Sequence, residues 1–70
     1  MNMAELKAAM ARKNISIPQL ANLLKISKKT IYSRFSGETD FSLSEIRKIA
    51  VILELSNDDI MVIFFAEKVA

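Results

Sequence analysis

The sequence predicts an all-α fold of five short helices, and two observations point to it. The 70-residue chain contains one glycine and one proline, and so few breakers favour helices joined by short turns over a β-rich fold. The second observation is a short pattern that occurs four times. An apolar residue precedes a serine, and a second apolar residue follows four positions after that serine. The pattern occurs as Ile15-Ser16 with Leu20, Ile26-Ser27 with Ile31, Phe41-Ser42 with Ile46, and Leu55-Ser56 with Ile60.

This pattern is typical of a helix start. The serine hydroxyl accepts a hydrogen bond from a free N–H of the first turn, and the apolar residue before it packs on the fourth helical residue. Gln19 and Glu45 can complete a capping box with their serines, and Asp59 is a weaker partner. With a further helix at the amino terminus, the expected helices cover about 3–13, 17–25, 28–36, 43–54 and 57–68.

Length and composition indicate one small globular domain over 1–70. The chain has 51% hydrophobic and 26% charged residues, with no cysteine and no histidine. This excludes a disulfide scaffold, an ordinary zinc or haem site, and catalysis by His or Cys. We therefore expect no metal, no cofactor and no small-molecule ligand. Because the carboxylates are scattered and one glycine cannot form a phosphate-binding loop, we also expect no enzymatic activity.

The longest apolar run, residues 60–66, is far shorter than the roughly 20 residues that a membrane helix needs. No basic-then-apolar signal peptide opens the chain, and we expect a cytoplasmic protein. Residues 1–48 carry nine Lys and Arg against four Asp and Glu, whereas residues 49–70 carry one against four. This asymmetry favours one face built for an anionic partner.

The second and third helix starts are the informative pair. Ser16 and Ser27 are eleven residues apart, which leaves room for about two helical turns and a short turn, the geometry of a helix-turn-helix over about 17–36. The second helix of this pair would present polar side chains outward along one stripe. Those residues are Lys28, Lys29, Tyr32, Ser33 and Ser36. Lys and Ser can reach base edges or phosphates, and Tyr can reach a phosphate.

The stretch SIPQLANLLKISKKTIYSRFSG, residues 16–37, resembles the Cro/repressor-type helix-turn-helix family of phage and bacterial transcription regulators. Its matching marks are Leu20-Ala21, Leu24, Ile26-Ser27, Thr30-Ile31 and Phe35-Ser36-Gly37. The two later helix starts, at Phe41-Ser42 and Leu55-Ser56, are also similar to the family, so the resemblance covers nearly the whole chain. It implies a five-helix lambda-repressor-like domain that binds double-stranded DNA and regulates transcription, of phage or prophage type.

The resemblance implies a role for each matching residue. It puts Lys28, Lys29 and Ser33 at base-reading positions. It puts Thr30, Tyr32 and Ser36 near phosphates, the loop 37–40 close to the DNA backbone, and Arg34 on the flank, facing a phosphate or an acidic neighbour.

Two positions depart from the family. Ile17 stands where many members have a phosphate-binding Gln. Lys25 stands where many have Gly, so a left-handed backbone there would cost about 1–2 kcal/mol. We expect attraction of the Lys25 ammonium to phosphate to offset that cost.

The last expected helix is too apolar for an ordinary surface helix. Ile60, Ile63 and Phe64 fit one stripe and would close the core, which leaves Met61, Val62 and Phe65 exposed. Exposed apolar groups of this size indicate an interface, and the resemblance implies a homodimer formed through this helix. The alternative is a protein-interaction module or antitoxin on the same fold, which would act through the apolar carboxyl-terminal helix.

Overall fold

The computed structural model describes residues 1–65, and these residues form helices without a strand. The helices are α1 (Met3–Arg12), α2 (Ile17–Leu24), α3 (Lys28–Ser36), α4 (Leu43–Ile52) and α5 (Asn57–Ile60), and α5 continues as the π-helical segment η1 (Met61–Phe65). The expected all-α fold of five helices is confirmed. Both ends of α1 to α4 and the start of α5 lie within two residues of their expected positions.

The predicted serines cap the four later helices. The hydroxyls of Ser16, Ser27, Ser42 and Ser56 each accept from the backbone N–H three residues on, at 3.0–3.2 Å. The capping box is complete at three of these starts, because the third helical side chain also accepts from the N–H of the capping serine. The box at Ser56, expected to be weaker, has both of its hydrogen bonds.

The same short turn ends three helices. Asn14, Lys25 and Glu54 adopt positive φ values of 58°, 60° and 53°, in the left-handed region that L-residues rarely enter. The N–H of the next residue then bonds back to a carbonyl five residues earlier, as in the pairs Ile15–Met10, Ile26–Ala21 and Leu55–Ala50. Each turn therefore consists of three consecutive residues. The first has a left-handed backbone, the second is apolar and packs on the core, and the third is the serine that caps the next helix.

The core takes buried side chains from α1 to α4, from η1 and from the connecting segments, and the half-buried Ile60 of α5 packs against it. Its buried side chains are Leu6, Ala9, Met10, Leu20, Ala21, Leu24, Ile31, Phe41, Ile46, Ile49, Leu53, Ile63 and Phe64. Phe41 lies between Phe35 of α3 and Phe64 of η1, with ring centroids 5.8 and 5.9 Å away and near-perpendicular planes. Such edge-to-face pairs are favourable, and this row of three rings joins α3 to the carboxyl-terminal helix.

The last helix departs from the expected regular α-helix. It changes from α to π geometry at Met61, and its expected continuation over 66–68 lies outside the described residues. The expected inward stripe is confirmed, with Ile63 and Phe64 buried and Ile60 half-buried. A π turn holds one more residue than an α turn, so it shifts the register of the side chains that follow it.

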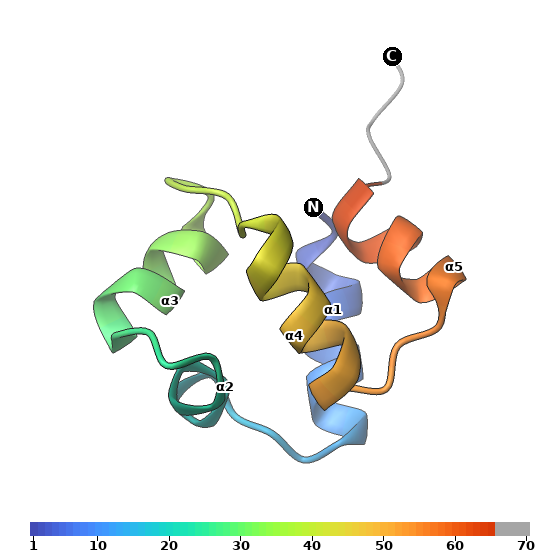
Figure 1. Ribbon diagram of the computed structural model, residues 1–70, viewed down its shortest axis with the longest axis horizontal. Coiled ribbons are helices and arrows are strands. Elements are labelled where there is room, and N and C mark those ends of the chain that lie inside the picture. Colours follow the sequence, from blue (N-terminus) through green and yellow to red (C-terminus); the bar gives the residue numbers. More distant parts are fainter. Residues whose placement is uncertain (66–70) are drawn as a thin grey trace.

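Figure 1 shows how the helices enclose the core. α4 crosses in front of α1, while α3 and α5 lie on opposite sides of it, and α2 closes the lower end next to α3. The N–H of Asn2 donates to the carbonyl of Ile63 at 2.6 Å, which ties the start of the chain to η1. Within residues 1–65, no helix is long and apolar enough to cross a membrane.

Candidate nucleic-acid interface

α2 and α3 form the helix pair that the sequence predicts. Both pack into the core, α2 through Leu20 and Leu24 and α3 through Ile31. The three residues between the helices take the left-handed, apolar and capping positions of the shared turn. α3 is thus held on one side by the core, and its opposite side is free to meet a partner.

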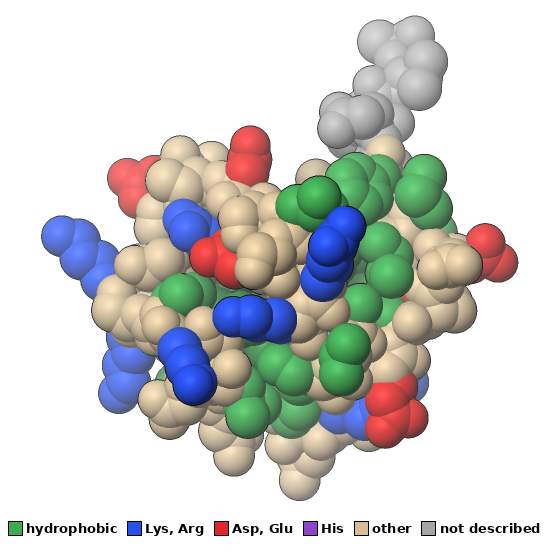
Figure 2. All heavy atoms as spheres, viewed as in Figure 1, with side chains coloured by type: hydrophobic (Ala, Val, Ile, Leu, Met, Phe, Trp, Pro, Cys, Tyr) green, Lys and Arg blue, Asp and Glu red, His purple; other side chains and the backbone are tan. Residues whose placement is uncertain are grey.

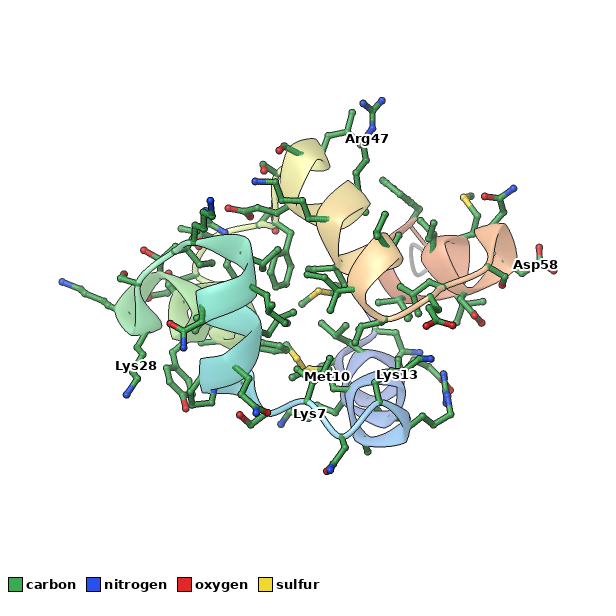
Figure 3. The ribbon with its side chains drawn as sticks, turned by 60° about the horizontal axis from the view of Figure 1, so that its bottom comes forward. Lys7, Met10, Lys13, Lys28, Arg47 and Asp58 are labelled. Atoms are coloured by element: carbon green, nitrogen blue, oxygen red, sulfur yellow. The ribbon has the colours of Figure 1, made fainter. Side chains whose placement is uncertain are left out.

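The exposed side of α3 carries two adjacent cations and an aromatic ring. Lys28, Lys29 and Tyr32 are exposed, and neither lysine forms an ion pair with any residue in 1–65. In Figure 3 the Lys28 side chain points away from the body of the molecule at the start of α3. Two exposed ammonium groups at the first turn of a helix, beside backbone N–H groups that have no partner within the helix, attract phosphate.

Lys and Arg side chains lie on both halves of the molecule. Figure 2 shows several of them over the half that contains α2 and α3 and others over α4, where hydrophobic side chains also gather toward the carboxyl-terminal helix. Lys25, in the turn before α3, is exposed and adds a third cation near Lys28 and Lys29. The backbone at Lys25 is left-handed, with φ 60° and ψ 41°, which is the conformation whose cost was considered for this position.

The serine and threonine hydroxyls on α3 are already engaged within the protein. Thr30 Oγ1 accepts from Ser27 Oγ at 2.9 Å, and Ser36 Oγ donates to the carbonyl of Ser33 at 3.0 Å. Ser33 Oγ lies 3.1 Å from Thr39 Oγ1 and donates to Glu38 Oε1 at 3.3 Å. A DNA contact by Ser33 would therefore exchange these hydrogen bonds for bonds to the nucleic acid.

Arg34 faces an acidic neighbour, which is one of the two partners expected for it. Its Nε and Nη2 atoms donate to the two carboxylate oxygens of Glu45 at 3.0 and 3.1 Å, and Nη1 donates to Thr39 Oγ1 at 2.7 Å. The Arg34 and Glu45 side chains are 19% and 14% exposed. The hydrogen bond from Arg34 is the main cause that holds the pKa of Glu45 below its ordinary value, and it raises the pKa of Arg34.

The carboxyl-terminal residues expected at an interface are exposed. Met61, Val62 and Phe65 expose 56%, 45% and 44% of their surface. Leu43 and Val51 on the outer side of α4 are also exposed, and they account for further apolar surface on that half of the molecule. Ile17, at the first position of α2, is half-buried and packs against the core. It cannot donate the hydrogen bond that Gln provides at this position.

Comparison with protein families agrees with this geometry. A family model described as a Cro/C1-type helix-turn-helix DNA-binding domain matches residues 5–65. The chain belongs to this family. Among curated proteins and among solved structures, no match to this chain was found. As a member of the Cro/C1-type family, the chain carries a helix-turn-helix DNA-binding domain.

Three contacts around this site were not predicted, although the loop 37–40 was expected close to DNA. Glu38 and Thr39 of the α3–α4 loop reach Ser33, and Glu45 of α4 holds Arg34. Sequence reasoning found Glu45 as a helix cap, and its pattern with Ser42 gave no sign of a second bond to α3. Because these contacts cross an irregular loop, helical periodicity carries no signal for them.

Proposed function

We propose that this protein is a sequence-specific transcriptional regulator, of the Cro/repressor-like kind, that inserts α3 into the DNA major groove. The observation that carries the proposal is the pair of exposed lysines, Lys28 and Lys29, at the start of the second helix of the pair α2–α3. These lysines form no ion pair within residues 1–65. In such units the first residues of this helix meet the base edges. Lys28, Lys29 and Ser33 are the proposed base-reading residues, because Lys reaches guanine O6 and N7 and Ser bonds to any base.

The proposed phosphate contacts surround these positions. Lys25, Tyr32 and Ser36 are exposed on or next to α3, and Thr30 lies in its first turn. Side chains of these types commonly bind phosphate and so fix the orientation of a domain on DNA. A regulator of this kind acts on DNA in the cytoplasm, and it needs neither a cofactor nor catalytic groups.

We further propose that two copies associate through Met61, Val62 and Phe65. These side chains are exposed next to Ile63 and Phe64, which are buried, and exposed apolar surface of this kind marks a contact with another protein. A two-fold dimer would present two recognition helices about 34 Å apart, the spacing of successive major grooves on one side of DNA. The preferred site would then be a two-fold symmetric sequence.

Selection from a pool of randomised duplexes tests the proposed function. The protein should enrich one two-fold symmetric sequence, and its affinity for that duplex should fall steeply with salt because bound counterions are released. Failure to enrich any sequence, together with no duplex binding at low salt, would contradict the proposal. That result would favour the second candidate, a protein-interaction module or antitoxin that acts through the apolar carboxyl-terminal helix.

A further inference from the structure

One carboxylate joins three parts of the structure around the recognition helix. Glu45 Oε1 accepts from the Ser42 N–H at 3.0 Å, which caps α4, and also from Arg34 Nε at 3.0 Å. Glu45 Oε2 accepts from Arg34 Nη2 at 3.1 Å. A two-pronged arginine–carboxylate pair fixes orientation as well as distance, because both groups are planar and meet edge to edge. The pair therefore locks the carboxyl-terminal half of α3 to the start of α4.

Arg34 extends this lock into the α3–α4 loop. Its Nη1 donates to Thr39 Oγ1 at 2.7 Å, and the Thr39 N–H donates to the carbonyl of Ser33 at 3.4 Å. Thr39 Oγ1 is also 3.1 Å from Ser33 Oγ. Ser33, a proposed base-reading residue, is thus connected to Arg34 through a single threonine.

All three nitrogens of the Arg34 guanidinium have acceptors, and its side chain is 19% exposed. The carboxylate of Glu45 largely neutralises its charge. Lys28 and Lys29, in contrast, are exposed and have no ion-pair partner within residues 1–65. A DNA phosphate would have to break the Arg34–Glu45 pair to reach the guanidinium, and the freed carboxylate would then repel that phosphate.

We infer that Arg34 and Glu45 are positioning residues, which hold α3 and the loop 37–40 in the arrangement that reads a specific DNA sequence, and that Arg34 does not bind phosphate itself. This inference rests on the proposed function. Of the two partners that the family resemblance implies for Arg34, it selects the acidic neighbour and excludes the phosphate. It also gives an acidic residue a part in binding a polyanion, which total charge alone would not suggest.

Four variants test the inference: Glu45→Gln, Arg34→Lys, Arg34→Gln and a control. Glu45→Gln keeps a capping side chain for α4, because Gln also completes a capping box, but it breaks the ion pair. Arg34→Lys keeps the positive charge and loses the two-pronged geometry. The matched control is Glu54→Gln, which makes the same change in net charge at an exposed ion pair with Lys13, 3.1 Å long and on the α1–α4 side of the molecule. Circular dichroism at the assay temperature checks that each variant is folded.

Binding is measured by fluorescence anisotropy on two labelled duplexes: the sequence enriched by the wild-type protein and a scrambled duplex of the same composition. Glu45→Gln and Arg34→Lys should each weaken binding to the enriched duplex about tenfold, the scale of losing the contacts to one base pair. Binding to the scrambled duplex should change less than about twofold. Glu54→Gln should bind both duplexes as the wild type does or slightly more tightly.

The salt dependence separates positioning from direct contact. If Arg34 bound a phosphate, Arg34→Gln would lower the slope of log affinity against log salt on the scrambled duplex by about 0.9, whereas a positioning role leaves that slope unchanged. A lower slope in Arg34→Gln, or Glu45→Gln binding the enriched duplex as tightly as Glu54→Gln does, would overturn the inference.

A measurement without DNA keeps this inference separate from the proposed function. Loss of the pair should speed hydrogen exchange of the Thr39 amide in Glu45→Gln, because this amide bonds to Ser33 in the connected loop. If the wild-type protein enriches no duplex, the proposed function fails on its own. Unchanged exchange at Thr39 in Glu45→Gln would then overturn the positioning role as well.

Discussion

Replacing Lys25 by glycine should stabilise the fold and weaken DNA binding at the same time. Lys25 ends α2 with φ 60° and ψ 41°, a conformation that costs an L-residue about 1–2 kcal/mol and costs glycine almost nothing. Glycine also gains about 0.5–1 kcal/mol of conformational entropy in the unfolded chain. The difference predicts a net gain of about 0.5–1 kcal/mol, or a rise in Tm of roughly 2–8 °C for a domain of this size.

Glu54→Gly is the matched control for this variant. Glu54 has φ 53° in the same type of turn, on the α1–α4 side of the molecule and away from α3. Urea denaturation followed by circular dichroism should show a stability gain in Lys25→Gly and a smaller one in Glu54→Gly, which also loses the exposed ion pair with Lys13, worth about 0–1 kcal/mol. Anisotropy should show weaker duplex binding, with a salt slope lower by about 0.9, only in Lys25→Gly.

Unchanged or lower stability in Lys25→Gly would refute the reasoning on backbone strain. Unchanged DNA binding would instead refute the proposed contact of Lys25 with phosphate.

Three further predictions concern acid stability, the core and association. Arg34 lowers the pKa of Glu45. The Arg34–Glu45 pair therefore contributes its full stabilisation at pH values above the ordinary carboxyl pKa, and this stabilisation is lost as the pH falls through the lowered pKa. Urea denaturation from about pH 6 to about pH 2 should therefore show a smaller acid loss in Glu45→Gln than in the wild type, and equal losses would contradict the assignment. Ile49→Ala, at a fully buried site of α4, should lower the free energy of unfolding by about 2–5 kcal/mol. Val51→Ala, at a side chain that is 78% exposed, should lower it by less than about 0.5 kcal/mol. Similar losses of stability in the two variants, measured by urea denaturation, would count against the assigned core. Phe65→Glu should keep the circular dichroism spectrum and shift the sedimentation coefficient to that of a monomer, and a wild type that is already monomeric at working concentration would argue against the proposed dimer.

Local sequence signals were sufficient to predict where the helices begin. Each serine cap depends on residues within four positions of it, and the capping bonds form at all four predicted sites. The left-handed turn was anticipated only at Lys25, from the family resemblance. Asn14 and Glu54 also precede an apolar residue and a serine, and they adopt the same left-handed conformation. The residue before each apolar-serine pair therefore marks the end of the preceding helix in these three turns.

Features that depend on tertiary structure could not be predicted in this way. The π geometry at Met61–Phe65 has no marker in the local sequence. The contact between Arg34 and Glu45 joins residues eleven positions apart across a loop, where helical periodicity does not apply. For the candidate site, the period of α3 was enough to predict that Lys28, Lys29 and Tyr32 are exposed, but the hydrogen bonds of Ser33 depend on how the loop folds back.

The central claim is that α3 is the surface that meets DNA, and a comparison of two double variants tests it most directly. Lys28→Ala/Lys29→Ala removes the two exposed cations of α3, while Arg47→Ala/Lys48→Ala removes two exposed cations of α4. Figure 3 shows Arg47 on the opposite side of the molecule from Lys28, and both variants lower the net charge by the same amount.

Duplex binding is measured by anisotropy across a salt series for the wild type and both variants. The account predicts that the α3 variant loses most of its affinity and that its salt slope falls by about 0.9 for each of the two lysines that neutralises a phosphate. The α4 variant should stay close to the wild type. Equal losses in the two variants would mean that net charge alone attracts DNA, and would contradict the assignment of α3 as the DNA-binding surface.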